Sequence, residues 1–272
     1  MKACEAVRHS IRAIETAELS NDPYKHLVID GIFPGDYYLE MLANFPRQDL
    51  MPNSRPDVHQ MDLKLDPGVE RFADGTLTID NTLQQSEPAK YDFWSAFRDA
   101  YFTDDFCRTI MGRFDDDLDD RDRNDFYPVG RLAIDLKGAG LGPHRDRDDK
   151  ICSVLFYLGD TFDPAVAEPF GTLALRATKN GARGSQHFGY DGFEIAKVIT
   201  YLPNRFVCWA VTRDNKPNES FHAYHQTLDR PRRLIKFFVQ RRDDIEDVGR
   251  TIESTRDRAD DWRKDVPLKS DN

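Results

Sequence analysis

Apolar residues follow a helical period in the first part of the chain and a strand-like alternation in the second. Near-helical spacing predicts an amphipathic helix over residues 1–19, with an apolar face made of Ala3, Val7, Ile11 and Ile14. A short strand is expected in "HLVIDGIF", residues 26–33. A helix should follow in "PGDYYLEMLANFP", residues 34–46, because a proline bounds this segment at each end.

Two more helices are expected before the character of the chain changes. The segment "YDFWSAFRDAYF" predicts a helix with an aromatic face. Thr103 is a suitable N-cap for the next helix, because its hydroxyl can accept a backbone N–H. Two aspartates follow it where the helix dipole favours acidic side chains. Residues 47–88 lack a clear period and predict loops with one or two short strands, and the charged run 115–125 predicts a solvated loop.

From Val129 onward, seven short apolar runs separated by turns predict strands. They read "VGRLAIDL", "ICSVLFYL", "GTLALRA", "FEIAKVITYL", "RFVCWAVT", "SFHAYH" and "RRLIKFFVQ". This number of short strands is typical of a sandwich or barrel. Both alternating faces of "ICSVLFYL" are largely apolar, so we expect this strand to be covered on both sides, on one of them by the early helices.

The expected fold is therefore mostly β with supporting helices. We expect a single domain over residues 1–272, which is long enough for one large buried core. Within it, residues 1–128 should form mainly helical support, 129–241 the β core, and 242–272 a charged C-terminal helix or tail.

Composition and charge exclude several classes of protein. Hydrophobic residues make up 39% of the chain and charged residues 32%, which is ordinary for a globular protein, and the formal net charge is −10. A negative surface repels phosphate backbones, which argues against a nucleic-acid substrate. The four cysteines form no Cys-x-x-Cys pair and indicate a reducing compartment. The N-terminus is too charged for a secretory signal and no apolar run reaches membrane-spanning length, so we expect a cytoplasmic protein without membrane contact.

The candidate chemistry lies in "GPHRD", at the start of the β region. In an extended chain, residues two apart project to the same side, so His144 and Asp146 can direct an imidazole and a carboxylate at one point. A second histidine from a distant strand would complete a face of two histidines and one carboxylate, which binds iron(II) and leaves coordination positions open. The late run "ESFHAYHQ" offers two candidates, His222 and His225.

A cation at the start of an apolar strand is the second chemical feature. Arg232 and Arg233 open "RRLIKFFVQ", and Arg232 lies ten residues after His222. A buried cation needs a partner, and the neighbouring sequence offers no obvious one. A dicarboxylate cosubstrate would supply it, because a guanidinium binds a carboxylate through two parallel hydrogen bonds.

Taken together, "GPHRD", "SVLFYL", "GTLAL", "SFH" and "RRLI" resemble the double-stranded β-helix of the iron(II)- and 2-oxoglutarate-dependent dioxygenases, particularly the prolyl-hydroxylase-like branch. These pieces span residues 129–241 in the family's order. The segment "KHLVIDGIFPGDYYLEMLANFP" is similar to the lead-in of many members. The resemblance implies a jelly-roll barrel with the N-terminal helices packed on one sheet.

The resemblance also implies roles for individual residues. His144, Asp146 and His222 would be the iron ligands, with His222 preferred over His225 because it follows the "S-x-H" pattern. Arg232 would bind the distal carboxylate of 2-oxoglutarate. Arg233 is the alternative, since strand register decides which of the two points inward. Tyr157 matches a tyrosine that hydrogen-bonds the same carboxylate, and a core tyrosine satisfied elsewhere is its alternative role.

The activity implied is oxidation of an unactivated C–H bond, with dioxygen consumed and with succinate and carbon dioxide released. Ascorbate would serve as the reductant in vitro. A polar small molecule is the expected substrate, either an amino acid, a sugar or a natural-product intermediate. Three alternatives stay open: hydroxylation of a protein side chain, a cupin-type metal isomerase that does not respond to 2-oxoglutarate, and a barrel without catalytic activity. The sequence leaves the oligomeric state undetermined.

Overall fold

The protein is described from a computed structural model. The structure describes residues 1–51, 59–65, 79–160, 171–178, 189–212, 219–225 and 230–241. Every statement of structure below refers to these residues. The C-terminal segment 242–272, for which a helix or tail is expected, lies outside them.

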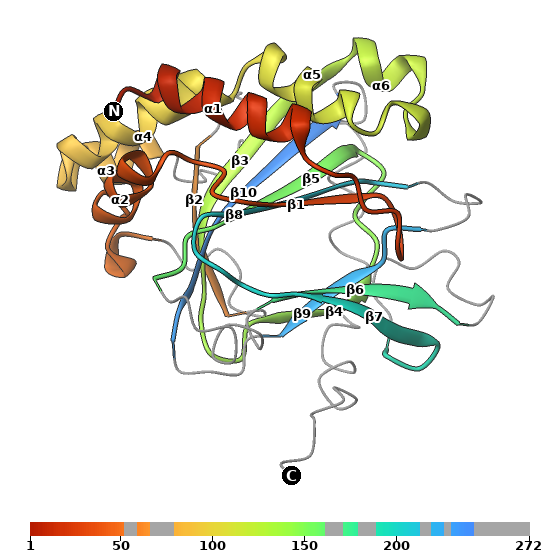
Figure 1. Ribbon diagram of the computed structural model, residues 1–272. Coiled ribbons are helices and arrows are strands. Elements are labelled where there is room, and N and C mark those ends of the chain that lie inside the picture. The colour runs from red at the N-terminus through yellow and green to blue at the C-terminus, as the bar shows by residue number, and fades with distance from the viewer. Residues whose placement is uncertain are drawn as a thin grey trace.

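The helices form one layer that covers the larger of two sheets (Figure 1). They are α1 (Ala3–Thr16), α2 (Gly35–Ala43), α3 (Ile79–Ser86), α4 (Pro88–Tyr101), α5 (Asp104–Gly112) and α6 (Asp120–Asn124), with 3-10 turns at Gln48–Leu50 and Asp115–Asp117. Thr103 caps α5 as predicted, since its hydroxyl accepts the N–H of Phe106.

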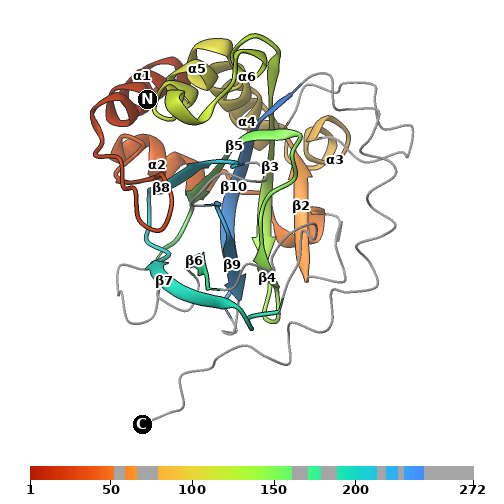
Figure 2. The ribbon, with the colours of Figure 1, turned by 90° about the vertical axis from the view of Figure 1, so that its right-hand side faces the viewer.

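Ten strands form two antiparallel sheets. They are β1 (His26–Asp30), β2 (Gln60–Lys64), β3 (Phe126–Asp135), β4 (Gly140–His144), β5 (Lys150–Tyr157), β6 (Thr172–Ala177), β7 (Phe193–Ile199), β8 (Arg205–Ala210), β9 (His222–His225) and β10 (Arg232–Arg241). The larger sheet has the order β1-β8-β5-β10-β3-β2, and the smaller sheet has the order β4-β9-β6-β7. The two sheets face each other across the interior of a barrel (Figure 2).

The strand order is that of a jelly roll. From β3 to β10 the chain crosses from one sheet to the other between consecutive strands, except between β6 and β7, which pair within the smaller sheet. As a result β8, β5, β10 and β3 are neighbours in one sheet and β4, β9, β6 and β7 in the other. Two interleaved four-stranded sheets of this kind are the double-stranded β-helix. The predicted fold class is therefore confirmed, with β1 and β2 added at the two edges of the larger sheet.

Strand alternation in the larger sheet separates two cores. Outward-facing residues of β3, β5, β8 and β10 pack with the helices in one large cluster, which includes Phe156, Phe206 and Phe237. Inward-facing residues of the same strands form a second cluster inside the barrel, which includes Tyr157, Trp209 and Leu234. A third, smaller cluster containing Phe221 lies on the outer side of the smaller sheet. Both faces of residues 151–158 were predicted to be apolar and covered. The helix layer covers one face, and the other face lines the barrel interior.

The structure also differs from the sequence-based expectations at several elements. The acidic run 115–125 contains a 3-10 turn and the short helix α6, where a loop was expected. The segment 79–86 is helical, although no helix was expected there, and "GLGPH" is itself a strand. Short elements with charged or glycine-rich sequences carry no readable period, which explains why these were missed.

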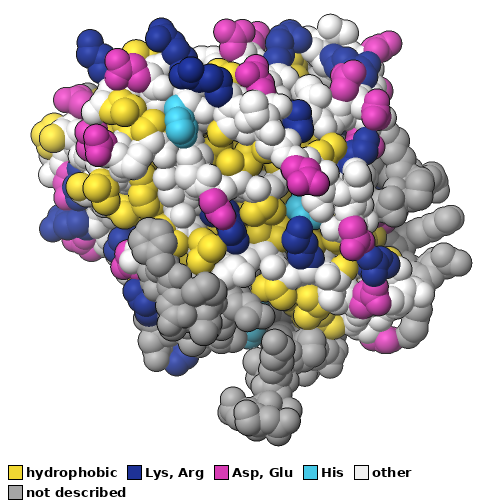
Figure 3. Space-filling model, in the orientation of Figure 1, with side chains coloured by type: hydrophobic (Ala, Val, Ile, Leu, Met, Phe, Trp, Pro, Cys, Tyr) yellow, Lys and Arg dark blue, Asp and Glu magenta, His cyan; other side chains and the backbone are white. Residues whose placement is uncertain are grey.

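Two further observations concern the helices and the surface charge. None of the helices in the described ranges is long and apolar enough to cross a membrane. On the face shown in Figure 3, lysine and arginine side chains are interspersed with aspartate and glutamate. The single domain over residues 1–272 stays a prediction.

We predict that Phe156→Ala will lower the free energy of unfolding by about 3–5 kcal/mol, because it leaves a cavity between the larger sheet and the helices. The Phe156 ring stacks on Phe33 with 5.2 Å between ring centroids. Chemical denaturation measures the change. Leu39→Ala is the control, since Leu39 is 64% exposed, and should change the free energy by less than about 0.5 kcal/mol. A loss below about 1 kcal/mol in Phe156→Ala would contradict the packing of helices on this sheet.

Candidate metal centre

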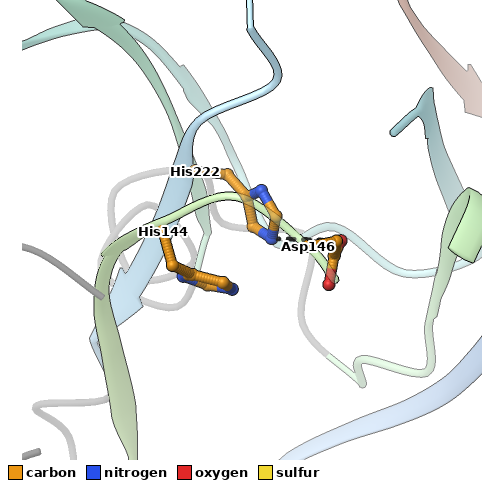
Figure 4. A group of neighbouring side chains, drawn as sticks. All are labelled: His144, Asp146 and His222. Carbon is orange, nitrogen blue, oxygen red and sulfur yellow. Dashed lines mark ion pairs between the residues drawn. The ribbon is translucent and has the colours of Figure 1, made fainter. Parts of the chain in front are cut away.

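Three side chains that could ligate a metal ion meet at one end of the barrel interior. His144 is the last residue of β4, Asp146 follows two residues later, and His222 is the first residue of β9. Their candidate ligand atoms all lie within 4.8 Å of one another, and all three residues are buried. Figure 4 shows the two imidazole rings and the carboxylate turned towards one another.

Strand pairing brings the two histidines together. β4 and β9 are antiparallel neighbours, and His144 pairs with His222 in their register. Directly paired residues project to the same face of a sheet. The imidazole centroids consequently lie 4.2 Å apart, and His222 Nε2 lies 3.6 Å from Asp146 Oδ2. His144 and His222 are 78 positions apart in the chain, and they meet because the jelly-roll topology makes β4 and β9 neighbours.

Backbone carbonyls orient both imidazole rings. His144 Nδ1 lies 2.8 Å from the Gly142 carbonyl oxygen, and His222 Nδ1 lies 3.0 Å from the Ser220 carbonyl oxygen. A carbonyl oxygen can only accept, so Nδ1 carries the proton in each ring. This tautomer makes Nε2 the nitrogen that can bind a metal, and a second hydrogen bond of this kind is usual for metal-binding histidines.

Asp146 is a buried carboxylate held by two donors. Lys150 Nζ donates to Oδ1 at 2.5 Å, and Ser153 Oγ donates to Oδ2 at 2.7 Å. Burial raises the pKa of Asp146, but the charge and hydrogen bond of Lys150, with the two nearby imidazoles, outweigh burial and hold the pKa well below its usual range. The carboxylate is therefore ionised, which a metal ligand requires.

His222 is held as a neutral imidazole. Its ring lies 4.5 Å, centroid to centroid, from the indole of Trp209, which projects inward from β8. Burial lowers the pKa of His222, and the nearby Asp146 opposes this only in part. A neutral imidazole is the form that binds a metal ion.

The donor set fits a divalent transition metal. Two imidazole nitrogens and one carboxylate oxygen on one side of an ion form the facial arrangement of iron(II) oxygenases, which leaves other coordination positions for ligands. Hydrogen bonds to all three side chains restrict their rotation before any metal binds. The residues present therefore fit the iron(II) site that the sequence resemblance implies.

Arg232 projects into the same barrel interior. It alternates with Leu234, which belongs to the inner cluster, and only 1% of it is exposed. Its guanidinium carbon lies 5.3 Å from the ring centroid of Tyr157, and Nη2 lies 3.5 Å from Thr172 Oγ1. The Tyr157 hydroxyl lies 2.6 Å from the same Thr172 oxygen. These three residues form a small group of donors around one point of the interior.

Arg232 has a carboxylate neighbour from a distant strand. No partner for it was expected from the neighbouring sequence, but the carboxylate of Asp135 lies across from it on β3, with Nη1 3.6 Å from Oδ2. Lys236 Nζ lies equally far from Asp135 Oδ1, and the Gln60 amide donates to the same oxygen. Arg232 Nε nevertheless has no hydrogen-bond partner within the described part of the chain although it is buried, so the guanidinium keeps one unsatisfied donor there.

The two alternatives left open by the sequence lie elsewhere. Arg233 alternates with Ile235 of the outer cluster, and its guanidinium carbon lies 5.5 Å above the Phe45 ring on the helix side. His225 is three residues from His222 on β9 and therefore projects to the opposite face of the smaller sheet. Among the described residues, the group that could hold a metal contains His222 and not His225.

Several residues of this interior were missed from the sequence. Arg145 donates to the Thr212 carbonyl, and Lys150 contacts the candidate ligand Asp146. No sequence pattern signals the contact between Asp146 and Lys150, because side chains four residues apart meet regularly only on a helix and these two flank a turn before β5. Thr172 and Asp135 gave no signal, because their proximity to Arg232 depends on sheet register.

Comparisons with known proteins give likenesses of fold. No protein-family profile and no curated protein matches the chain. A prolyl-4-hydroxylase from Pseudomonas putida is 16% identical with a TM-score of 0.42, covering 87% of this chain and 99% of that one. A prolyl hydroxylase from Trichoplax adhaerens, in complex with a hypoxia-inducible-factor peptide fragment, is 13% identical with a TM-score of 0.46, covering 86% and 89%. HygX from Streptomyces hygroscopicus, with nickel and 2-oxoglutarate bound, is 11% identical with a TM-score of 0.44, covering 79% and 82%.

Proposed function

We propose that this protein is an iron(II)- and 2-oxoglutarate-dependent oxygenase that hydroxylates an unactivated C–H bond of a polar small molecule. The observation that carries the proposal is the convergence of His144, Asp146 and His222 in the interior of a jelly-roll barrel that also contains the buried Arg232. The alternative of a cupin-type isomerase would explain the metal ligands but gives no role to a buried arginine with an unsatisfied donor.

The protein's own residues would hold and orient the reactants. His144, Asp146 and His222 would hold the metal, and Arg232 would bind the distal carboxylate of the cosubstrate, supported by Tyr157 and Thr172. When bound, iron(II) and 2-oxoglutarate activate dioxygen and oxidise the substrate, with release of succinate and carbon dioxide. The two sheets exclude water from the interior, which strengthens each of these charge interactions.

Charged residues along one wall of the barrel support a polar substrate. Asp62 on β2 and Arg131 on β3 form an inward-facing ion pair at 3.1 Å. Lys236 on β10, which also lies near Asp135, pairs directly with Arg131. Such groups prefer a ligand with its own charges or hydrogen-bonding groups. A protein side chain is the second candidate, and a screen for succinate formation with metabolite pools and with peptides would separate the two.

Replacing His144, Asp146 or His222 with alanine should abolish iron(II) binding, because two ligands leave too few bonds to hold the ion. Calorimetric titration of iron(II) into oxygen-free protein measures the effect, and circular dichroism confirms the fold. His225→Ala is the matched control and should bind iron(II) as the unmutated protein does. Retention of binding in His222→Ala with loss in His225→Ala would reverse the assignment.

Arg232→Ala should weaken 2-oxoglutarate binding at least a hundredfold, since a buried carboxylate without its partner costs about 3–5 kcal/mol. Arg232→Lys should restore only part of the affinity, because an ammonium cannot form the two parallel hydrogen bonds of a guanidinium. Titration of 2-oxoglutarate into iron-loaded, oxygen-free protein, followed by the metal-to-ligand absorption band, gives the midpoint.

Arg233→Ala is the control for this titration and should leave the midpoint unchanged. A large shift in Arg233→Ala with none in Arg232→Ala would move the role to the neighbouring residue. Absence of the band in the unmutated protein would refute the oxygenase proposal and leave the isomerase or a non-catalytic barrel.

Lys150→Met should lower the stability of the metal-free protein by about 3 kcal/mol or more, because Asp146 would keep a buried charge without its main partner. The same change should tighten metal binding, since the ammonium and the metal ion repel each other beside one carboxylate. Lys150→Arg keeps the charge and should change both quantities much less. Thermal melts of the metal-free protein and metal titrations measure the two effects, and weaker metal binding in Lys150→Met would contradict this account.

A further inference from the structure

Among the residues that the structure describes, three buried tyrosines have a hydroxyl group without a hydrogen-bond partner. They are Tyr24, Tyr37 and Tyr190. A buried hydroxyl without a partner costs free energy relative to phenylalanine at the same place. Such a hydroxyl is either tolerated because the ring packs well, or it is satisfied by a ligand that binds there. The surroundings of the three rings distinguish these cases.

Tyr37 and Tyr190 lie where their rings fill a core. The Tyr37 ring is in the helix layer, 6.2 Å from Phe33 and 5.5 Å from Phe93 between centroids. Tyr190 belongs to the small cluster on the outer side of the smaller sheet, together with Phe221. Both rings therefore lie outside the inner cluster of the barrel. Packing accounts for both rings.

Tyr24 lies in the barrel interior. It precedes β1 and is only 1% exposed, and it packs in the inner cluster with Tyr157 and Trp209. Trp209 contacts the candidate ligand His222, and Tyr157 contacts Arg232. The cluster that holds Tyr24 therefore touches both the metal centre and the proposed carboxylate site.

The unsatisfied groups of this interior are mostly donors. Besides the Tyr24 hydroxyl, Trp209 Nε1 and Arg232 Nε are buried N–H groups without a hydrogen-bond partner among the described residues. Asp135 Oδ2, 3.6 Å from Arg232 Nη1, is an acceptor that also lacks a hydrogen bond there. Burial raises the pKa of Tyr24 well above its usual value, and the charge of Asp146 adds to this, so the hydroxyl stays protonated and can donate. A ligand that satisfies three donors must be rich in acceptor oxygens.

We propose that the Tyr24 hydroxyl donates a hydrogen bond to bound 2-oxoglutarate, as a third anchor between the metal ligands and Arg232. The inference rests on the proposed function, because it requires 2-oxoglutarate to extend from the metal to Arg232. A ligand with its keto acid at the metal and its far carboxylate at Arg232 would extend along the inner cluster, whose members include Tyr24, Tyr157 and Trp209. Its five oxygens are all acceptors at neutral pH, which matches the donors present.

Tyr24→Phe tests the proposal because it removes only the hydroxyl. The midpoint for 2-oxoglutarate, measured with iron-loaded, oxygen-free protein by the metal-to-ligand band, should rise about tenfold, which corresponds to about 1.4 kcal/mol. The melting temperature of the ligand-free protein should rise by about 2 °C, because an unsatisfied buried group is removed. If Tyr24 served only in packing, Tyr24→Phe could raise the melting temperature but would not weaken ligand binding.

Tyr37→Phe is the matched control, since its hydroxyl is also buried and unpartnered but lies in the helix layer. It should raise the melting temperature to a similar extent and leave the midpoint unchanged. An unchanged midpoint in Tyr24→Phe, an equal shift in Tyr37→Phe, or a lower melting temperature in Tyr24→Phe would overturn the inference. Absence of the band in unmutated protein would instead refute the proposed function, so the two failures are distinguishable.

Discussion

The ionised carboxylate of Asp146 is the constraint on which the candidate site depends. A carboxylate removed from water stays charged only if cations and hydrogen-bond donors compensate for the lost hydration. Lys150 and Ser153 supply those donors from the start of β5, and two imidazoles lie close enough for a metal ion to join them. The pairing of β4 with β9 supplies the imidazoles, so the site exists only when the whole barrel is folded.

The helix layer makes a polar barrel interior possible. The outer face of the larger sheet packs with the helices in one continuous apolar core, and this burial is the main source of stability. The inner face is therefore not needed as a purely hydrophobic core. It carries Arg232, Asp135 and Lys236 on two neighbouring strands, together with aromatic residues whose polar atoms lack partners. Unsatisfied groups of this kind are rare in native cores and are expected where a ligand binds.

The sequence predicted the fold class and the elements with strong periodicity, because a hydrophobic pattern depends only on local sequence. It missed α3, α6 and β4, which are short or rich in charges and glycine. At the site, the spacing of His144 and Asp146 was enough to predict that they act together. His222 was predicted only from a family resemblance, because its place beside them depends on strand register. Register also determines that Arg232 points inward and Arg233 outward. The positions of Asp135, Thr172 and Tyr24 in the barrel interior could not be predicted from the sequence, because the residues around them lie on strands that are distant in the chain.

The central claim is that His144, Asp146 and His222 form one metal centre. Anomalous diffraction at the iron edge, from crystals grown without oxygen and loaded with iron(II), tests it most directly. The account predicts one strong peak on the order of 2 Å from His144 Nε2, His222 Nε2 and an Asp146 carboxylate oxygen. A peak at the acidic run 115–125, or no peak between the two histidines, would contradict it.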